Sequence, residues 1–392
     1  MPADRPSLKR RRLALHGLAA LAGAWVWPRH AMAVEDGGAA CGPWPAWDAF
    51  VGNFLQDDGR VVDPGEPDRR STSEGQSYAL FFALVGNDQA RFDRILQWTE
   101  NNLAQGDLTR HLPAWWWGHD VDSGTWRVLD DNSASDADLW LAYALIEAAR
   151  LWGRPGLGET GMRLLQTVRA REVLDVPGLG AMLLPGAIGF VEADLWRFNP
   201  SYLPLPLLRR FAAVDRRGPW PAMARNALAM LVQASPHGFA PDWVAWQAGR
   251  FVVDPAKGAI GSYDAIRVYL WAGMTAPDDP AAKTLLRSLH GPLDLLQREG
   301  RLAERVDTRT GTPAGSAPYG FHAALLPYLQ AQGQSSLVMQ LRGSMPTVEQ
   351  QRQALAYYAQ ALALFGLGWL EGRYRFGRDG RLQPGWLRCT TG

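Results

Sequence analysis

Three acidic residues, Glu74, Asp136 and Asp264, each stand at the start of a predicted helix. Glu74 follows Ser73, a predicted N-cap, and Gln76 completes a capping-box pattern three residues after Ser73. A single acid in a first helical turn often does no more than complement the helix dipole. Three such acids in one tryptophan-rich chain instead favour a shared site for carboxylate chemistry.

The elements that must position these acids are helices. Hydrophobic periodicity predicts about twelve of them, over residues 47–55, 74–85, 89–103, 136–152, 158–171, 203–213, 221–233, 264–274, 281–298, 319–329, 335–341 and 348–365. Short connections alternate with long ones rich in Gly, Pro and Trp, so the helices pair into six hairpins.

Six hairpins without a break in composition predict an all-α fold with one domain over residues 34–392. In this fold a ring of six inner helices is closed inside six outer helices. The order of the helices along the chain puts all three acids on inner helices and at the same end of the ring. The long connections enter at that end, where they form an open cleft that can gather the acids.

The long connections also carry aromatic side chains, on which sugar rings could stack. Trp115, Trp116 and Trp117 form the densest run, and Tyr202 lies in the next long connection. Because tryptophan is highly buried on average, each of these side chains could instead belong to the core. Their position beside Gly, Pro and Asp favours a role in substrate binding for at least one of the three tryptophans.

Composition and motifs argue against several other functions. Without residues 1–33, Lys plus Arg falls from 40 to 34 and Asp plus Glu from 39 to 38, a formal charge of −4 with no basic stripe suited to nucleic acid. A dinucleotide-binding pattern at residues 156–161 follows a helix rather than a strand. A serine nucleophile pattern at residues 75–79 also lacks its strand. The histidines are scattered, so we expect no metal and no cofactor.

The N-terminus has the features of a secretory signal. A basic cluster at residues 9–12 precedes an apolar run at 13–26 and a small-residue cleavage pattern at 31–33. The apolar run is too short to span a membrane. We therefore expect a periplasmic or secreted protein, exported by the general or the twin-arginine route, with no membrane span after the signal is removed. Cys41 and Cys389 could form a disulfide in an oxidising compartment or remain free thiols.

The stretch from Ala134 to Trp152 resembles the signature of glycoside hydrolase family 8. It contains Ala-Ser-Asp-Ala-Asp at 134–138 and Ala-Tyr-Ala-Leu-Ile at 142–146, and it departs only at Leu141, where the family prefers Ile or Met. The strings at 72–78, 199–204 and 262–269 are similar to those of the periplasmic cellulases in this family that are associated with bacterial cellulose synthase.

This resemblance implies an (α/α)6 barrel that hydrolyses β-1,4-glucan with inversion of the anomeric carbon. It implies that Glu74 is the general acid, that Asp264 is the general base and that Asp136 binds the sugar at the cleavage subsite. Further substrate-binding residues are expected in or beside the matching strings, at Asn199, Tyr202, Tyr263 and Arg267. Arg267 could hold Asp264 in its ionised form or could pair with it for structural reasons only.

The expected partners are a cellulose chain and the export machinery of cellulose synthase. Two alternatives remain open, a chitosanase or xylanase of the same family and a noncatalytic glycan-binding component of a synthase complex. A general acid also needs a raised pKa, whereas a helix N-terminus lowers the pKa of Glu74. The dipole contributes only about 0.3–1 kcal/mol, so we expect burial and the charge of Asp136 to prevail.

Overall fold

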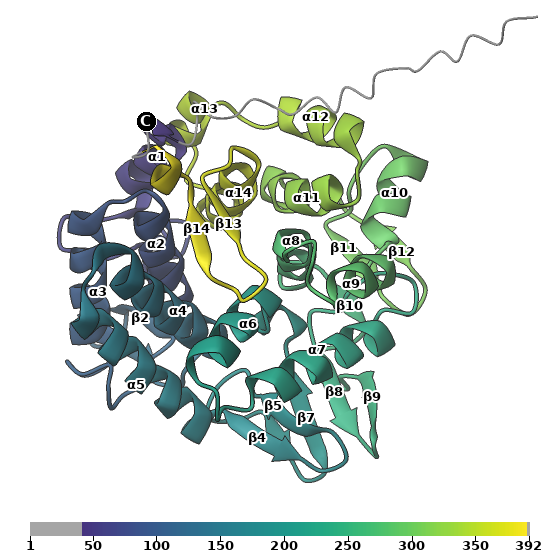
Figure 1. Ribbon diagram of the computed structural model, residues 1–392, viewed down its shortest axis with the longest axis horizontal. Helices are drawn as coiled ribbons and strands as arrows, with labels where there is room; N and C mark the ends of the chain where they lie inside the picture. Colours follow the sequence, from purple (N-terminus) through teal and green to yellow (C-terminus); the bar gives the residue numbers. More distant parts are fainter. Residues whose placement is uncertain (1–40, 390–392) are drawn as a thin grey trace, which may run out of the picture. The chain divides into compact units, whose positions relative to one another are not determined.

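The computed structural model describes residues 41–389, which belong to one compact unit. The predicted secretory signal, residues 1–33, lies outside the described residues. The centre of the unit is a ring of inner helices (Figure 1), namely α2 (Ser73–Val85), α4 (Ser135–Trp152), α6 (Leu205–Val214), α8 (Ala265–Met274), α11 (Tyr319–Ala331) and α14 (Tyr357–Leu370). Each packs against the next in this order. Phe81 and Phe82 of α2 meet Phe365 of α14 and close the ring.

The outer helices surround this ring, and most of them cover it with one apolar face. They are α1 (Pro45–Phe54), α3 (Gln89–Leu103), α5 (Pro155–Arg171), α7 (Trp220–Ala234), α9 (Ala282–Ser288), α10 (Gly291–Glu299), α12 (Ser335–Gly343) and α13 (Val348–Gln353). In α3, for example, Phe92, Ile95 and Leu103 are buried while most of the opposite face is exposed. Inner helices such as α8 are buried on every side, which explains why they are apolar all round. The predicted all-α double ring is confirmed.

Two of the predicted helices are interrupted. The helix predicted over 281–298 ends at Ser288 and restarts as α10, because Pro292 cannot continue a helix but fits a first turn. The helix predicted over 348–365 is broken after Gln353 without any proline. There the side-chain amide of Gln360 donates hydrogen bonds to the carbonyl oxygens of Gln351 and Ala354, at 2.7 and 2.6 Å, and so holds the break open.

The predicted capping box at the start of α2 is wrong. The N-cap is Thr72, whose hydroxyl oxygen accepts a hydrogen bond from the Gly75 backbone N–H at 3.1 Å. Gln76 does not return to the helix start, because its buried side chain serves a tertiary contact. Its carbonyl oxygen accepts from the Val61 N–H at 2.6 Å, and its amide donates to the Thr99 hydroxyl at 2.9 Å.

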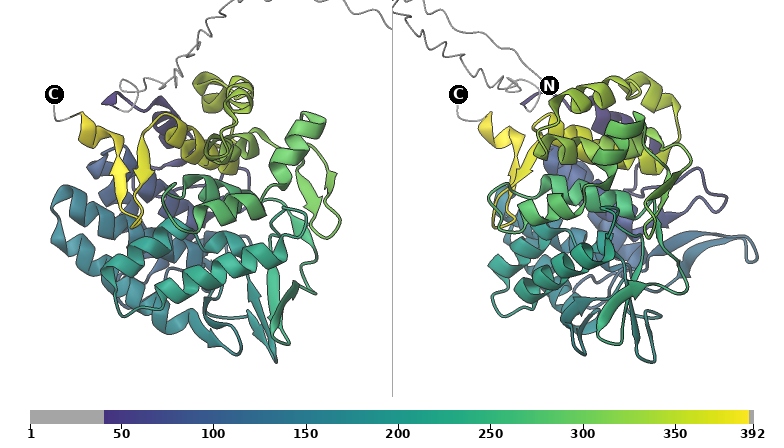
Figure 2. Two further views of the ribbon diagram at one scale, coloured as in Figure 1. Left: turned by 45° about the vertical axis from the view of Figure 1, so that its right-hand side comes forward. Right: turned by 90° about the vertical axis from the view of Figure 1, so that its right-hand side faces the viewer.

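The long connections fold into antiparallel hairpins and small sheets rather than irregular loops. Their strands are β1 (Ser71–Thr72), β2 (Trp116–Asp120), β3 (Thr125–Asp130), β4 (Val173–Val176), β5 (Gly180–Leu183), β6 (Val191–Glu192), β7 (Leu195–Phe198), β8 (Val244–Gln247), β9 (Arg250–Val253), β10 (Ile260–Gly261), β11 (Arg305–Asp307) and β12 (Thr312–Ala314). They pair in the orders β1-β2-β3, β4-β5, β6-β7-β8-β9 and β10-β11-β12. A further pair, β13 (Tyr374–Phe376) and β14 (Leu382–Pro384), lies at the opposite end of the ring from β2 and β3, as the right-hand view of Figure 2 shows.

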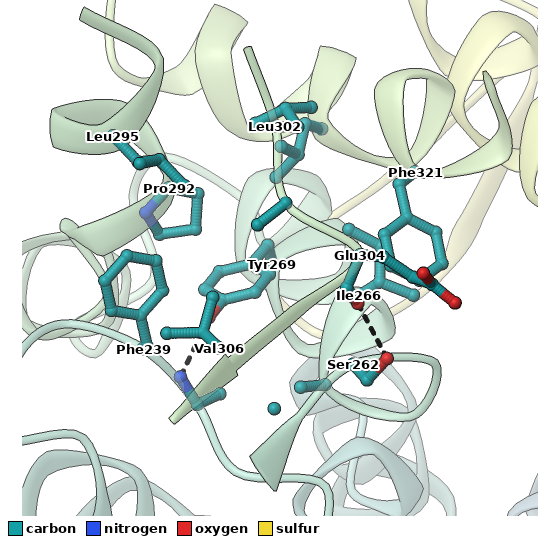
Figure 3. Close-up of a pocket in the computed structure, with 15 residues that line it drawn as sticks. Phe239, Ser262, Ile266, Tyr269, Pro292, Leu295, Leu302, Glu304, Val306 and Phe321 are labelled. Atoms are coloured by element: carbon teal, nitrogen blue, oxygen red, sulfur yellow. Dashed lines mark hydrogen bonds between the residues drawn. The ribbon is translucent and has the colours of Figure 1, made fainter. Parts of the chain in front are cut away.

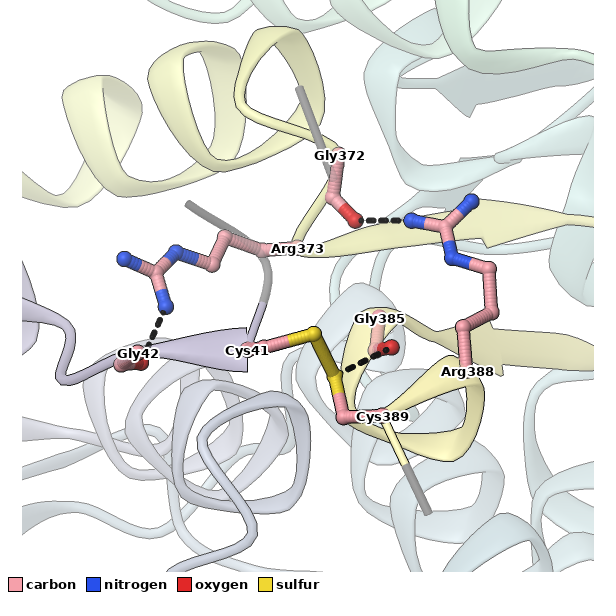
Figure 4. Close-up of a disulfide and its surroundings, with 7 residues drawn as sticks. All are labelled: Cys41, Gly42, Gly372, Arg373, Gly385, Arg388 and Cys389. Carbon is pink, nitrogen blue, oxygen red and sulfur yellow. Dashed lines mark hydrogen bonds between the residues drawn. A yellow bond between two sulfur atoms is a disulfide. The ribbon is translucent and has the colours of Figure 1, made fainter. Parts of the chain in front are cut away.

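Cys41 and Cys389 form a disulfide that joins the two ends of the described chain (Figure 4). The guanidinium of Arg373 adds to this closure by donating hydrogen bonds to the carbonyl oxygens of Gly42 and Pro43, both at 2.7 Å. The structure thus decides the question that the sequence left open. Across residues 41–389, none of the helices has both the length and the apolar character needed to cross a membrane.

Candidate active site

The three acids meet at the end of the ring where the β1-β2-β3 sheet begins. Glu74 lies in the first turn of α2, Asp136 in the first turn of α4, and Asp264 directly before α8. Glu74 and Asp264 line one cavity of about 280 Å³, whose other lining residues are Thr72, Tyr78, Tyr263, Arg267, Tyr357, Tyr358 and Ala361. Asp136 lies deeper and is 1% exposed. A cavity of this size with convergent polar groups has the character of a ligand site.

A single buried cation connects two of the acids. The guanidinium of Arg267 donates one hydrogen bond to Asp136 Oδ2 at 2.8 Å and another to Asp264 Oδ1 at 2.6 Å. It also donates to the hydroxyl oxygen of Tyr78 at 2.8 Å. Burial raises the pKa of Asp136 above its ordinary value, and the positive charge of Arg267 opposes that rise in part. No hydrogen bond or ion pair between Arg267 and Glu74 is found among the described residues.

Glu74 has the chemical properties of a proton donor. Its burial, followed by the negative charge of Asp136, raises its pKa to about 8. The Ser73 hydroxyl lies 3.4 Å from Glu74 Oε2 and opposes this shift only in part. This direction agrees with the expectation that burial and the charge of Asp136 outweigh the helix dipole. A carboxylic acid with this pKa is mostly protonated at neutral pH and can donate its proton there.

Asp264 is placed where a carboxylate could accept a proton from water. It is the N-cap residue of α8, but its carboxylate makes no capping hydrogen bond and contacts Arg267 instead. Its side chain is 29% exposed, so a water molecule can reach it in the cavity. A neutral carboxylic acid and an accessible carboxylate in one cavity form the pair that acid–base hydrolysis requires.

The start of α4 rests on a second pair of buried acids. Asp138 shares a hydrogen bond with Glu172, and burial raises the pKa of Glu172 to about 8. The Ser133 hydroxyl donates to Glu172 Oε1 at 2.5 Å and accepts from the Ala187 N–H at 3.1 Å. These contacts tie the turn before Asp136 to the connection that follows α5.

The three neighbouring tryptophans have different surroundings. Trp116 donates to Asp68 through its indole N–H at 2.6 Å. Trp117 stacks on Trp126 with ring centroids 5.3 Å apart and also meets Trp98 edge to face. Trp115 is half-buried, and its one ring contact among the described residues is with Trp116 at 5.3 Å. Its carbonyl accepts from the Ser73 N–H at 3.1 Å, which fixes it beside the start of α2.

The other predicted substrate-binding residues fall into two groups. Tyr263 lines the cavity, and Tyr202 lies under the guanidinium of Arg267, which is 5.5 Å from its ring centroid. Asn199 is 2% exposed, and its side-chain oxygen accepts from the Ser201 N–H and hydroxyl at the start of a 3₁₀ turn (Pro200–Tyr202). Asn199 therefore shapes the backbone beside the site and is not among the residues that line the cavity.

Sequence reasoning missed several residues of the cavity. Tyr78 has helical spacing typical of a core residue, yet its hydroxyl reaches Asp136 and Arg267. Tyr357 and Tyr358 come from α14, about 280 residues after Glu74 in the chain, and only the closure of the ring brings them to the site. Asp242 accepts three backbone N–H groups around Asp264, and no local motif marks it in the sequence.

A second cavity, shown in Figure 3, is lined in part by Gly261 and Ser262, which lie just before Asp264 in the chain. Its walls are mostly apolar and include Phe239, Tyr269 and Phe321. Its volume is about 40 Å³, which leaves room for only a few water molecules at roughly 10–15 Å³ each. It is too small for a sugar ring. Among residues 41–389 there is also no group of three or more His, Cys, Asp or Glu side chains placed to hold a metal ion.

Comparison with known proteins gives consistent similarities. The family described as glycosyl hydrolases family 8 matches residues 22–372. An endoglucanase of Xanthomonas axonopodis pv. citri (strain 306) is 53% identical, over 97% of this chain and 98% of that protein. An endoglucanase of Escherichia coli (strain K12) is 44% identical, over 89% and 92% of the two chains.

Solved structures agree with these sequence matches. An endo-1,4-D-glucanase from Vibrio fischeri ES114 superposes with a TM-score of 0.83 at 40% identity, over 88% of this chain and 99% of that chain. The endo-β-1,4-glucanase CMCax from Acetobacter xylinum superposes with a TM-score of 0.69 at 27% identity, over 85% and 97% of the two chains.

Proposed function

Because this chain belongs to glycosyl hydrolase family 8, we propose that it is an inverting endo-β-1,4-glucanase that cleaves cellulose-type β-1,4-glucan. The observation that carries this proposal is the pairing of Glu74 and Asp264 in one cavity. Glu74 has a pKa of about 8, and Asp264 keeps an accessible carboxylate bound to Arg267. The names of the relatives, endoglucanase in each case described above, support the choice of substrate.

The reaction is a single displacement by water. Glu74 donates its proton to the glycosidic oxygen as the bond between that oxygen and the anomeric carbon breaks. Asp264 accepts a proton from a water molecule, whose oxygen attacks the anomeric carbon from the opposite face of the sugar. The leaving chain departs with a new hydroxyl group and the anomeric carbon is inverted. Glu74 ends ionised and Asp264 ends protonated, and proton exchange with solvent resets both.

Asp136 supports both steps from beneath the cavity. Its negative charge raises the pKa of Glu74, and its ion pair with Arg267 at 2.8 Å holds that guanidinium against Asp264. The resemblance of residues 134–138 to the family signature also implies a sugar contact for Asp136, which in this structure is 1% exposed beneath the cavity. In this proposal Arg267 holds Asp264 in its ionised form and does more than pair with it structurally.

Sugar rings bind on aromatic side chains along the cleft. Trp115 provides a stacking platform next to Glu74, because its ring is the one of the three neighbouring tryptophans that carries the fewest protein contacts among the described residues. Tyr263, which is 47% exposed at the cavity, and Tyr202 complete the proposed contacts. Asn199 contributes by holding the turn that carries Tyr202.

We further propose that the enzyme is periplasmic or secreted and acts during bacterial cellulose synthesis and export. The features of residues 1–33 support export, and the disulfide between Cys41 and Cys389 fits an oxidising compartment. The resemblance to cellulases associated with cellulose synthase supports a role at the synthase export machinery. Fractionation of cells that express the full chain, followed by a pull-down of synthase components, tests the location and the partner separately.

Two assays test the catalytic proposal. Initial rates on a soluble cellulose derivative, chitosan and xylan should be highest on the cellulose derivative, whereas a preference for chitosan or xylan would select the alternative activity. A wild-type protein that binds cellulose but hydrolyses none of the three would instead be a noncatalytic glycan-binding protein. NMR of the first product should show the α-anomer before mutarotation, and early release of the β-anomer would contradict the role given to Asp264.

A further inference from the structure

Asp242 accepts hydrogen bonds from the backbone at the start of α8, although it lies 22 residues before Asp264 in the chain. Its Oδ1 atom accepts from the backbone N–H groups of Ser262 at 2.8 Å, Asp264 at 3.1 Å and Ala265 at 2.7 Å. Burial and the negative charge of Asp264 raise the pKa of Asp242 to about 6. Asp242 does not line the cavity that holds Glu74 and Asp264.

These hydrogen bonds cap the start of α8 from outside the helix. Asp242 accepts the N–H groups of Ser262, Asp264 and Ala265, and the next two N–H groups donate to the carbonyl oxygens of Ser262 and Asp264. Asp264 itself has helical dihedral angles, φ −82° and ψ −48°, and its carboxylate makes no capping hydrogen bond. That carboxylate contacts Arg267 at the cavity instead.

The segment that carries Asp242 is itself fixed against α8 and β10. The Ala240 N–H donates to the hydroxyl oxygen of Tyr269 on α8 at 2.8 Å, a contact drawn in Figure 3. The Asp242 N–H donates to the carbonyl oxygen of Ile260 at 2.7 Å. The carboxylate of Asp242 thus approaches the start of α8 from a rigid support rather than from a free loop.

We propose that Asp242 is a positioning residue, which caps α8 from a distance and so keeps the carboxylate of Asp264 aimed at the water that attacks the sugar. This inference rests on the proposed function, because it assigns Asp242 an effect through the base. When Asp242 is absent, the N–H groups of Ser262, Asp264 and Ala265 lose their acceptor, and the turn that carries the carboxylate of Asp264 is no longer held in place. The base is then misplaced while the walls of the cavity stay as they are.

The test compares three substitutions on a soluble cellulose derivative. Asp242→Ala removes the acceptor and should lower kcat by about 10- to 100-fold with little change in KM, since small misplacements of a reacting group have effects of this size. Asp242→Asn keeps an oxygen in the same place and should retain kcat within about threefold of wild type, because a neutral amide oxygen still accepts N–H groups. Asp242→Glu keeps the charge but displaces the oxygens and should resemble the Ala variant.

Asp254 supplies a matched control. It is also a buried aspartate that accepts backbone N–H groups, from Ala256 at 2.8 Å and Lys257 at 3.2 Å, in a turn of the same connection. Asp254→Ala should lower the melting temperature and leave kcat unchanged. If Asp254→Ala lowered kcat as far as Asp242→Ala, a general loosening of the connection would explain both effects, and the positioning role would be rejected.

The remaining outcomes separate this inference from the proposed function. If Asp242→Ala does not fold, the order of kcat between the Asn and Glu variants still decides, and a Glu variant more active than the Asn variant contradicts the proposal. In an Asp264→Asn background, Asp242→Ala should cause no further loss, since an effect through the base disappears with the base. Wild-type kcat in Asp242→Ala rejects the inference alone, whereas an inactive wild-type protein rejects the proposed function.

Discussion

Replacing Asp136 with Asn should move the alkaline limb of the pH–activity profile to lower pH. With a pKa of about 8, Glu74 is roughly 90% protonated at pH 7 and half protonated at pH 8. The charge of Asp136 is the second largest cause of this raised pKa, after burial. The substitution removes that charge and leaves the positive charge of Arg267, which lowers the pKa of Glu74, less compensated. Both changes lower the pKa of Glu74.

The size of the effect follows from the protonated fraction of Glu74. Above the pKa, this fraction falls tenfold for every unit by which the pKa decreases, whereas well below the pKa it hardly changes. The activity of Asp136→Asn relative to wild type should therefore fall steadily between pH 7 and pH 9. A loss that is equal at every pH would show that Asp136 acts only on sugar binding or on the position of Arg267.

The assay is kcat/KM on a soluble cellulose derivative from pH 5 to pH 10, since this quantity reports the ionisation of the free enzyme. Asp254→Asn is the matched control, because it also removes a buried aspartate from an ion pair, with Arg197 at 3.1 Å, away from the cavity. Its alkaline limb should coincide with that of wild type. A limb that remains near pH 8 in Asp136→Asn, or a wild-type limb near the ordinary glutamate pKa, would refute the electrostatic reasoning.

Three further outcomes are expected. Trp115→Ala should weaken the binding of cello-oligosaccharides by roughly 2- to 10-fold in calorimetry, because an aromatic contact contributes about 0.5–1.5 kcal/mol. The melting temperature should change little, and an unchanged affinity would show that Trp115 does not line the cleft. Trp117→Ala should instead lower the melting temperature, because its ring packs against Trp98 and Trp126. A stable Trp117→Ala variant with weakened binding would reverse the two roles. Reduction of the disulfide between Cys41 and Cys389 should lower the free energy of unfolding by roughly 2–5 kcal/mol without changing kcat under native conditions. A parallel loss of kcat would mean that this disulfide also shapes the site.

The stability of the Glu74→Gln variant tests the same pKa from another side. The pKa of Glu74 is about 8 in the folded protein and 4.5 in an unfolded chain. The protonated carboxyl group of Glu74 therefore stabilises the fold fully below pH 4.5, and this stabilisation is lost as the pH rises through about 8. Glutamine does not ionise. Glu74→Gln should therefore lose most turnover yet gain melting temperature relative to wild type as the pH is raised from 5 to 9. A melting-temperature difference that is constant across this range would contradict the raised pKa.

The ring of helices could be predicted because its signals are local. Hydrophobic periodicity marks each helix, and the alternation of short and long connections pairs the helices. The details that failed depend on contacts between distant residues. Gln76 has the right spacing for a capping box, but Thr99 and the Val61 N–H compete for its side chain and prevail. The break before α14 likewise depends on a buried amide, Gln360, rather than on a proline.

The residues of the site are likewise predictable only where their pattern is local in the sequence. The acids at helix starts stand out because the family signature and the first helical turns are continuous in sequence. Tyr358 and Asp242 could not be found, since neither belongs to a local pattern. The Tyr358 hydroxyl donates to the carbonyl oxygen of Tyr263 at 2.7 Å, so it holds the residue before Asp264 from across the ring. Side chains that position a reacting group act through the tertiary fold, and a single sequence does not carry that information.

The hydrogen bonds of Arg267 give Glu74 and Asp264 different electrostatic surroundings. Glu74 and Asp264 both lie at the N-terminal ends of inner helices, so the helix dipole favours the charged form of each. Arg267 bonds directly to Asp264 and to Asp136, and no such bond to Glu74 is present in the described residues. Among the charged neighbours, Asp136 therefore has the largest effect on Glu74, and its negative charge raises the pKa of Glu74 in addition to burial. Exchanging Arg267 for Lys, which cannot span both carboxylates with a planar fork, should leave the negative charge of Asp136 less compensated. The alkaline limb of kcat/KM should then move to higher pH, because the charge of Asp136 raises the pKa of Glu74. A limb that moves to lower pH would contradict this account.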